Sequence, residues 1–456
     1  MATILIKGGT LVTMNADRQI IRADLLIEND RIKKIRPAID FSADTIIDAR
    51  DRVIIPGLIQ PHIHLTQTLF RGLADDLELL DWLKKRVWPL EAAHTFESNR
   101  ISARLGISEL ILGGTTAVLD MGTVQHTRAI CEEVRDTGFR AVVGKCMMDH
   151  GQGVPRELME SLQDSIEESS RLMNEWHESA GGRIRYAFAP RFAVSCSDAL
   201  LLRVKEIARA NHTMVHTHAS ENQGEIALVE KERGMRNIQY FEKIGLTGET
   251  LALAHCIWLS KEEMNILADT GTRIVHCPSS NMKLASGIAK IPELLDMGAQ
   301  VSLAADGAPC NNNMSMFTEM RHAALIQKVR LLSPTAMPAD TIFEMATLGG
   351  ARALGLAHEL GSLEVGKKAD LALVDLNQPH TSPGMDRDPV SQLVYSASAC
   401  DVKTTIVNGR ILMKDRQLTT IDIKDTIAQA NHLCQAVMAR AGISSVVKPD
   451  VNREAV

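Results

Sequence analysis

Short apolar runs separated by turn residues occupy both ends of the chain. Three of them lie near the N-terminus, at 4–14, 23–35 and 45–55. Two more follow residue 363, at 368–375 and 402–414. Their alternation and their β-branched residues predict strands. Because neither end offers enough strands for a stable sheet, we expect one small β-sandwich built from both termini.

The middle of the chain has a longer repeating pattern, in which apolar runs alternate with amphipathic stretches. Eight runs are predicted strands, at 57–64, 116–122, 140–148, 183–192, 213–220, 251–259, 273–280 and 300–307. Capped helix starts such as Ser260-Lys261-Glu262-Glu263 lie between them. Eight strands that alternate with helices predict a closed barrel. A doubly wound open sheet is the alternative, although no glycine-rich dinucleotide loop supports it.

The predicted fold class is therefore α/β, a (β/α)8 TIM-type barrel with a small β-sandwich domain formed by both termini. A chain of 456 residues accommodates both parts. The expected divisions are the N-terminal part of the sandwich at 1–56, the barrel at 57–363, the C-terminal part of the sandwich at 364–421, and a C-terminal helix and tail at 422–456.

Composition limits which partners the protein can bind and indicates its cellular compartment. The formal charge of −6 argues against a general binder of nucleic acid or of anionic membranes, which needs a basic surface. Eight cysteines without a CxxC spacing indicate neither a disulfide framework nor a zinc ribbon. The N-terminal residues show no basic region followed by a long apolar run, and no apolar run reaches the length of a membrane span. We expect a cytoplasmic protein that binds neither nucleic acid nor membrane.

Histidines gather at the ends of the predicted barrel strands. They are His62 and His64 on the first strand, His216 and His218 on the fifth, His255 on the sixth and His276 on the seventh, and Asp306 follows on the eighth. Strand residues two apart point the same way, and barrel enzymes place their chemistry at the carboxyl ends of the strands. The pattern predicts a metal site of His62, His64, His218 and Asp306 with room for water.

Two further residues have the reach for proton transfer at this site. Glu221, three residues after His218, can carry a proton between water and a substrate ring nitrogen. His255 can orient or deprotonate the water together with Asp306, or bind the metal itself, and both roles stay open. His216 is expected to be a hydrogen-bonded core histidine, whereas His276 fits packing and the site equally well.

These motifs resemble those of the amidohydrolase superfamily, in particular the cytosolic branch that deaminates purines, purine nucleosides and related heterocycles. The resemblance rests on Pro56-Gly57, His62-Ile63-His64, His218-Ala219-Ser220-Glu221, His255-Cys256, His276-Cys277-Pro278-Ser279-Ser280-Asn281 and Ala305-Asp306-Gly307. It implies hydrolytic deamination and a homo-oligomer. Because the run 183–192 has no lysine to be carbamylated, the resemblance also implies one divalent metal per chain. Zn²⁺ is favoured, with Fe²⁺ or Mn²⁺ as alternatives.

The substrate markers within this branch conflict. Gln67 and Pro190-Arg191-Phe192 are similar to guanine deaminases, and an arginine fork with a glutamine amide suits a carbonyl-bearing base on which Phe192 stacks. Guanine or a close analogue is the first expectation. Trp88-Pro89-Leu90-Glu91 resembles deaminases of 5'-deoxyadenosine, 5'-methylthioadenosine or S-adenosylhomocysteine, the alternative substrates, for which Glu91 and Lys145 would govern recognition of the sugar or the 5' substituent. The loop after Asp306 also fits an s-triazine amino- or chlorohydrolase.

Two other classes of protein fit the sequence less well. A non-catalytic scaffold on this fold would be expected to have lost ligands, and none is missing. A polynucleotide base deaminase would carry the HxE and PCxxC zinc signature, which is absent. The sequence thus predicts an enzyme, a hydrolase that acts on carbon–nitrogen bonds in cyclic amidines, with a small heterocycle as its substrate.

Overall fold

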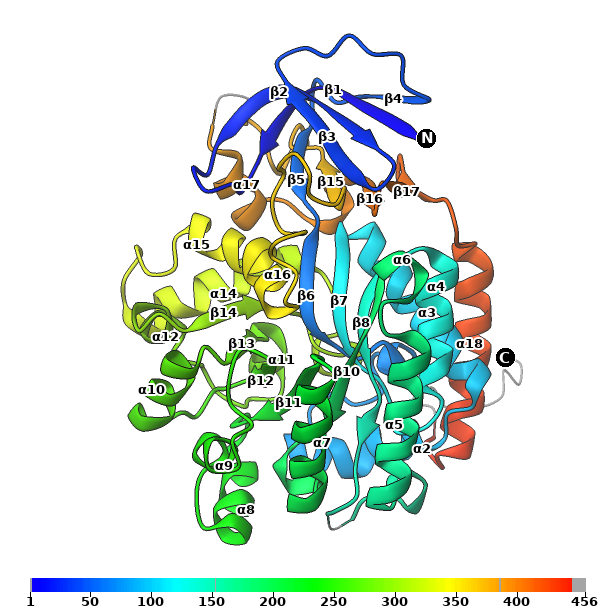
Figure 1. Cartoon of the computed structure of the whole chain (residues 1–456), viewed down its shortest axis with the longest axis vertical. Helices are drawn as coiled ribbons and strands as arrows, with labels where there is room; N and C mark the ends of the chain where they lie inside the picture. The colour runs from blue at the N-terminus through cyan, green and yellow to red at the C-terminus, as the bar shows by residue number, and fades with distance from the viewer. Residues whose placement is uncertain (1, 152, 385–386, 445–456) are drawn as a thin grey trace, which may run out of the picture.

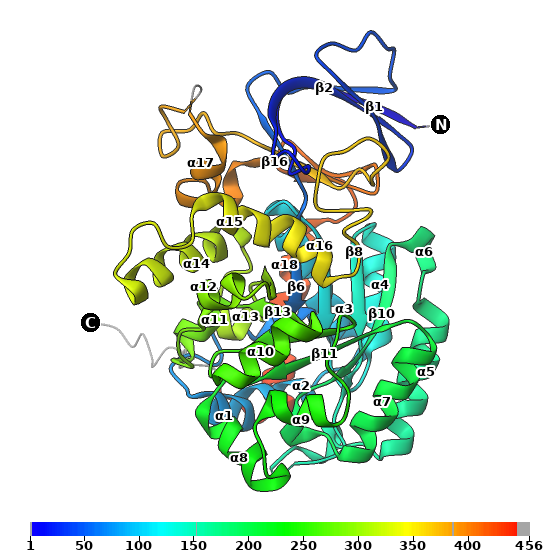
Figure 2. The same ribbon diagram turned by 60° about the vertical axis from the view of Figure 1, so that its left-hand side comes forward.

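A computed structural model describes residues 2–151, 153–384 and 387–444 and shows two β-sheets, one of them surrounded by helices (Figure 1). Figure 2 shows the same two parts from another side, with the strands of both chain ends at one end of the barrel and helices α8 (Gln223–Arg233) and α9 (Asn237–Lys243) at the other. The predicted fold class is confirmed. None of the described helices combines the length and apolar character that a membrane span requires.

The barrel sheet contains eight parallel strands in the order β14-β13-β12-β11-β10-β8-β7-β6, and a short ninth strand pairs with β10. The strands are β6 (Leu58–Ile63), β7 (Thr115–Met121), β8 (Arg140–Gly144), β9 (Cys146–Met147), β10 (Ile184–Pro190), β11 (Met214–Ala219), β12 (Leu251–His255), β13 (Arg273–His276) and β14 (Gln300–Leu303). Nearly all of their residues are buried, as expected for a parallel sheet covered by helices. The strands follow one another in chain order across the sheet without a reversal, which excludes the doubly wound alternative.

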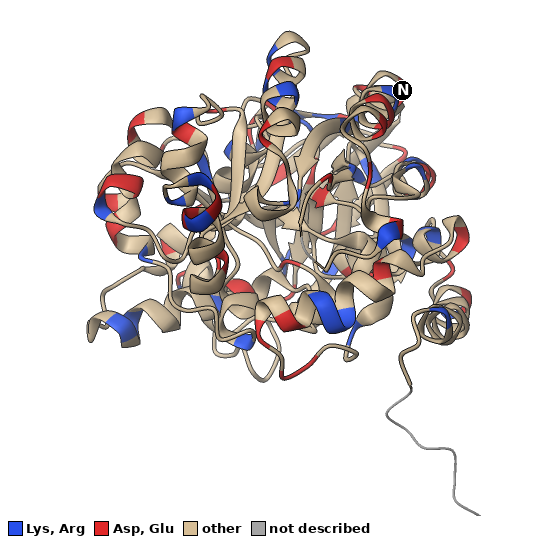
Figure 3. Cartoon of the chain, turned by 90° about the horizontal axis from the view of Figure 1, so that it is seen from below, with Lys and Arg blue, Asp and Glu red and all other residues tan. Residues whose placement is uncertain are grey.

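Helices follow the strands in alternation. They are α3 (Phe96–Leu112), α4 (Thr127–Thr137), α5 (Leu162–Trp176), α6 (Ser179–Gly182), α7 (Asp198–Ala210), α10 (Lys261–Thr270), α11 (Pro278–Lys283), α12 (Ile291–Asp296), α13 (Ala308–Asn311), α14 (Met316–Leu331), α15 (Ala339–Glu344) and α16 (Gly350–Ala353), besides α8 and α9. The predicted capping box before α10 is present, because the Glu263 amide donates to Ser260 Oγ and Glu263 accepts from the Ser260 amide. Figure 3, the view from below, shows basic and acidic residues intermingled over these helices.

Three predicted strands, 251–259, 273–280 and 300–307, extend too far. In the structure they end at His255, His276 and Leu303. His255 and Asp306 have φ of 74° and 64°, a left-handed conformation that a strand cannot continue through. Pro278 opens α11 at its first turn, where its missing N–H costs nothing.

The seam between β6 and β14 is closed by side chains and a helix. Gln60 on β6 accepts from the Ala305 amide beyond β14 at 3.1 Å and donates to the Met314 carbonyl at 3.0 Å. Across the seam lie the helical turn η5 (Met345–Gly349) and α16. A Cβ at Gly350 would lie 2.7 Å from Ile59 Cβ, so only glycine permits this close approach.

Both termini build the second sheet, whose order is β18-β17-β16-β15-β5-β1-β2-β3, with β4 beside β1. Its strands are β1 (Thr3–Val12), β2 (Ile20–Glu28), β3 (Arg31–Arg36), β4 (Thr45–Asp48), β5 (Val53–Pro56), β15 (Leu371–Val374), β16 (Val402–Val407), β17 (Arg410–Lys414) and β18 (Gln417–Leu418). The two chain ends meet where β15 pairs antiparallel with β5. The exact domain boundaries stay predictions.

Two more helices lie in the C-terminal part, α17 (Pro389–Tyr395) and α18 (Ile423–Arg440). α18 packs against α3 through an apolar cluster that includes Ile101, Val437 and Met438. The expected C-terminal helix is therefore present. The last part of the expected tail, 445–456, lies outside the described residues.

A segment between β6 and α3 covers the carboxyl ends of the barrel strands. It comprises η1 (Leu65–Phe70), α1 (Leu79–Trp82), η2 (Leu83–Val87) and α2 (Trp88–Ala92). We call residues 65–92 the cover segment. Its apolar side chains Leu79, Trp82 and Leu83 form one cluster with Phe192 and Leu284, which belong to the strand-end loops. This packing encloses the strand ends on which the predicted site lies.

A buried ion pair joins the barrel to the second sheet. Arg140 Nε at the start of β8 lies 2.7 Å from Asp370 Oδ2 just before β15, and both side chains are 3% exposed. We expect Arg140→Met to lower the free energy of unfolding by about 3–5 kcal/mol, because it leaves a buried carboxylate unpaired. Urea denaturation measures the change. Arg135→Met, which breaks the surface pair with Asp136, is the control and should cost less than about 1 kcal/mol; equal losses in the two variants would refute the idea.

Candidate functional site

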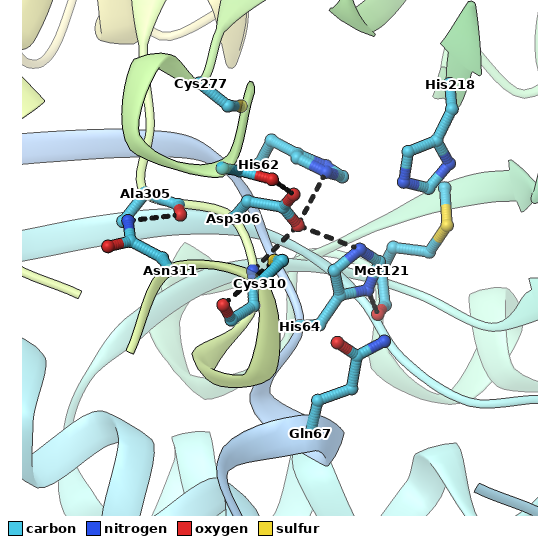
Figure 4. Close-up of polar contacts among 12 residues, drawn as sticks. His62, His64, Gln67, Met121, His218, Cys277, Ala305, Asp306, Cys310 and Asn311 are labelled. Atoms are coloured by element: carbon cyan, nitrogen blue, oxygen red, sulfur yellow. Dashed lines mark hydrogen bonds and ion pairs between the residues drawn. The ribbon is translucent and has the colours of Figure 1, made fainter. Parts of the chain in front are cut away.

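Five predicted site residues converge at the carboxyl ends of the barrel strands. His62 comes from β6 and His64 directly follows it, His218 comes from β11, His255 from β12, and Asp306 follows β14. The ligand atoms of His62, His64 and His218 lie within 4.8 Å of one another, as do those of His62, His255 and Asp306. Asp306 Oδ1 is 3.2 Å from His62 Nε2 and 3.3 Å from His64 Nε2 (Figure 4).

The second ring nitrogen of each predicted histidine ligand makes a hydrogen bond that orients its imidazole. His64 Nδ1 lies 2.8 Å from the Met121 carbonyl, and His218 Nδ1 lies 2.7 Å from the Arg191 carbonyl. A carbonyl accepts only, so each Nδ1 carries the proton and each Nε2 keeps a lone pair. The free lone pairs face the site, as metal binding requires.

His62 obtains the same tautomer through His216. His216 Nδ1 lies 3.3 Å from the Ala252 carbonyl and donates to it, so its Nε2 accepts from His62 Nδ1 at 2.8 Å. His62 Nε2 is then a bare lone pair, and it is buried without a hydrogen-bond partner among the described residues. An orphaned buried nitrogen next to a carboxylate fits a divalent metal. His216 thus lies behind the predicted ligands as a hydrogen-bonded core residue.

Electrostatics keep the predicted ligands in the states that bind a metal. Burial lowers the pKa of His64 to about 4 and holds the pKa of His218 well below its usual value, so both imidazoles are neutral. Three neutral imidazoles and one carboxylate form a donor set that suits zinc.

Glu221 and His255 lie beside this donor set. His255 Nε2 is 3.5 Å from Glu221 Oε2 and 3.8 Å from Asp306 Oδ2. Burial raises the pKa of Glu221 to about 7, a value suited to proton exchange near neutrality. Burial opposes a charge on His255, but Glu221 and Asp306 raise its pKa above the usual value. The pair can therefore exchange protons at the metal position.

A cavity opens on these residues beneath the cover segment. His64, His218, Glu221, His255 and Asp306 form its floor, and its apolar wall consists of Leu79, Trp82, Leu83, Phe192 and Leu284. Apolar walls around a few polar groups suit a flat heterocycle.

The predicted substrate-binding residues divide into two groups. Gln67, Arg191 and Phe192 line the cavity, whereas Glu91 and Lys145 do not. Glu91 lies behind the first two, because Arg191 Nη1 is 2.6 Å from its Oε2 and Gln67 Nε2 donates to its Oε1 at 2.8 Å. Burial disfavours the charge of Arg191, but Glu91 raises its pKa above the usual value. Lys145 forms an ion pair with Glu160 away from the cavity.

Several residues around the site were not singled out from the sequence. Ser280 Oγ donates to Asp306 Oδ2 at 2.7 Å, and Asn281 Oδ1 lies 2.9 Å from His255 Nδ1. Both belong to the His276–Asn281 motif, so this motif was the sequence signal that could have indicated them. Glu225 also lines the cavity and accepts from the Glu221 amide at 2.8 Å. His276 is buried outside the cavity lining, and neither ring nitrogen has a hydrogen-bond partner among the described residues.

The contact between His216 and His62 generates a prediction about metal affinity. We expect His216→Leu to weaken zinc binding about 10–100-fold, since His62 loses the acceptor that fixes its tautomer but keeps Nε2. Competition with a chromogenic chelator measures the affinity. His62→Ala, which removes a predicted ligand, gives the lower limit of zinc affinity for this comparison. An affinity of His216→Leu within twofold of the unaltered protein would show that the contact does not orient His62.

Comparisons with known proteins identify the family of the chain. The model of the Amidohydrolase family matches residues 53–412. Similar relatives are a 5'-deoxyadenosine deaminase of Methanothermobacter thermautotrophicus (40% identity, covering 92% of this chain and 96% of the relative) and a 5-methylthioadenosine/S-adenosylhomocysteine deaminase of Thermococcus onnurineus (40%, 91% and 95%). Similar solved structures are an adenosine deaminase of Xanthomonas campestris with bound zinc (TM-score 0.90, 31% identity, 96% and 99% covered) and the E. coli guanine deaminase (TM-score 0.82, 27%, 91% and 100%). The chain belongs to the amidohydrolase family, as its motifs predicted.

Proposed function

We propose that the protein is a metal-dependent hydrolytic deaminase of a small adenosine derivative with an uncharged 5' group, of which 5'-deoxyadenosine is the simplest. The observation that carries the proposal is 40% identity over 92% of the chain to a 5'-deoxyadenosine deaminase, combined with the converged site. This reverses the order expected from the sequence, where guanine came first. The products would be ammonia and the matching inosine derivative.

His62, His64, His218 and Asp306 would hold one divalent metal, zinc by preference, in keeping with the zinc-bound structure of similar fold. When bound, the metal would polarise a water molecule and lower its pKa. Asp306 and His255 lie where they can hold that water and accept its proton. Glu221 would pass a proton to the ring nitrogen beside the carbon under attack. Water would add to that carbon, and the proton taken from the water would pass to the amino group, which leaves as ammonia. The new hydroxyl would return its proton to Glu221 as it becomes the carbonyl of the product.

The cavity wall supports an uncharged 5' group. Among the described residues that line the cavity, Arg191 is the one arginine or lysine, and Glu91 pairs with it. Little positive charge therefore remains for the carboxylate of a homocysteine tail. Leu79, Leu83 and Leu284 instead offer apolar contact to a methyl or methylthio group. S-adenosylhomocysteine should be the poorer substrate.

Guanine is the second candidate, favoured by one specific observation. Gln67 Oε1 is buried without a partner among the described residues, while Arg191 keeps N–H donors beyond those that contact Glu91. An acceptor and a donor side by side match the N1–H and C6=O edge of guanine. Phe192 in the cavity wall can cover a ring face.

A direct test is ammonia release from a substrate panel by the zinc-loaded protein. The panel contains 5'-deoxyadenosine, 5'-methylthioadenosine, S-adenosylhomocysteine, guanine, 8-oxoguanine and aminotriazines. The expected order of kcat/KM places the first two compounds highest. Preferential turnover of guanine would restore the second candidate, and no ammonia from any compound would refute the deaminase proposal.

The position of Glu221 beside His255 leads to a prediction about the chemical step. We expect Glu221→Gln to retain zinc while kcat falls by a factor on the order of 10²–10⁴, because proton transfer is lost and the donor set is intact. Zinc content by mass spectrometry and steady-state kinetics measure the two effects. A kcat near that of the unaltered protein would remove Glu221 from the reaction.

Arg191 separates the two substrate candidates. For a guanine site, Arg191→Ala should cost about 2–4 kcal/mol in kcat/KM, since the purine carbonyl loses its donor. For an adenosine derivative, we expect KM to rise while kcat stays within about threefold, because Arg191 would then contribute to substrate binding and not to the chemical step. Kinetics on guanine and 5'-deoxyadenosine with zinc content as control decide. A collapse of kcat on 5'-deoxyadenosine at full zinc content would contradict our assignment.

A further inference from the structure

Glu319 is a fully buried carboxylate that the proposed chemistry does not use. It lies in the first turn of α14, is 0% exposed and is outside the cavity lining. Two other fully buried glutamates have arginine partners: Glu133 pairs with Arg104, and Glu263 with Arg236. Among the described residues, Glu319 has no such partner within ion-pair distance. A buried carboxylate without a cation is costly unless hydrogen bonds satisfy it.

The hydrogen bonds to Glu319 come from the two loops that hold the candidate site. The Ser279 amide donates to Oε2 at 3.1 Å, and the Ser279 hydroxyl donates to Oε1 at 2.6 Å. Asn311 Nδ2 donates to the same Oε1 at 2.8 Å. Ser279 lies in the first turn of α11, which follows β13, and Asn311 ends α13, which follows β14. One carboxylate therefore ties both strand-end loops together.

Each of the two loops also makes a hydrogen bond to a site residue, or to its neighbour in the chain, close to the contact with Glu319. On the first loop, Ser280 donates to Asp306 and Asn281 contacts His255 Nδ1, so the residues next to Ser279 hold both. On the second loop, the other hydrogen of Asn311 Nδ2 is donated to the Ala305 carbonyl at 2.7 Å, immediately before Asp306 (Figure 4). Glu319 is therefore connected to Asp306 and to His255 through two successive hydrogen bonds.

Backbone conformation explains why these groups need a restraint. Asp306 and His255 both have left-handed φ values, 64° and 74°. Such conformations persist in non-glycine residues when surrounding contacts over-determine them. The contacts that restrain Asp306 and His255 converge on Glu319, because Ser279 and Asn311 both donate to its carboxylate.

We propose that Glu319 is a positioning residue that sets Asp306 and His255 against the histidine ligands. The proposal rests on the proposed metal-dependent function. It expects zinc affinity and kcat to depend on Glu319, whereas KM does not, since Glu319 lies outside the cavity wall.

The test replaces Glu319 by glutamine, which has nearly the same shape but turns an NH₂ group toward one of the donors on Ser279 or Asn311. We expect zinc affinity and kcat each to fall about 10–100-fold with KM within about twofold. The absorption spectrum of the cobalt-substituted protein should change as well, because it reports ligand geometry. Chelator competition, kinetics and that spectrum are measured on the same preparations.

Glu133→Gln is the matched control. Glu133 is equally a buried glutamate, 1% exposed, but it pairs with Arg100 and Arg104 on the outer helices. It should lower thermal stability and leave zinc affinity and the cobalt spectrum unchanged. If Glu319→Gln behaves like Glu133→Gln, with stability as its only loss, Glu319 has a packing role and the proposal is wrong.

A milder variant covers the case in which Glu319→Gln does not fold. Ser279→Ala removes the shorter bond to Glu319 and keeps the amide donor. It should weaken zinc binding and kcat in the same direction, and unchanged values would overturn the proposal. Zinc affinity and the cobalt spectrum need no substrate. The Glu319 proposal can therefore fail or survive independently of the substrate panel.

Discussion

The orientation of three buried imidazoles is the constraint on which the candidate site depends. His64 and His218 are held by backbone carbonyls at the ends of neighbouring barrel strands, and His62 is held by His216. Each of these bonds assigns the proton to Nδ1 and leaves Nε2 to the site. Because the acceptors belong to the barrel, the pairing of the strands determines how the imidazoles of the donor set are oriented. Displacing one strand by one residue would turn its histidines away from the others.

Much of this arrangement could be predicted from the chain alone, and the reasons are local. A histidine two residues from another on a strand shares its face, and parallel strands end at one rim, so the convergence of His62, His64, His218 and Asp306 followed from periodicity and order. Residues at loop positions were harder. The ends of the strands near His255 and Asp306 were placed too late, because a left-handed residue leaves no periodic signal.

Long-range side-chain partners were beyond reach of the sequence for a different reason. Glu91 lies 100 residues before Arg191, and nothing near either residue indicates that they form a bidentate pair. Lys145 was expected at the substrate and instead pairs with Glu160. Charged residues within one motif look alike in sequence whether they contact substrate or one another. The pairing makes the Arg191 and Glu91 unit electrically neutral, which favours an uncharged ligand in the cavity.

The pairing of β5 with β15 has a consequence for how the chain is made. β5 leads directly into the barrel, yet one of its neighbours in the sheet is more than 300 residues further along the chain. During synthesis, the edge of the N-terminal strands has no partner strand until the barrel has emerged from the ribosome. Open apolar edges associate with other chains. Slow translation or premature termination within the barrel would thus expose this edge, and demand for chaperones should concentrate on the first 56 residues.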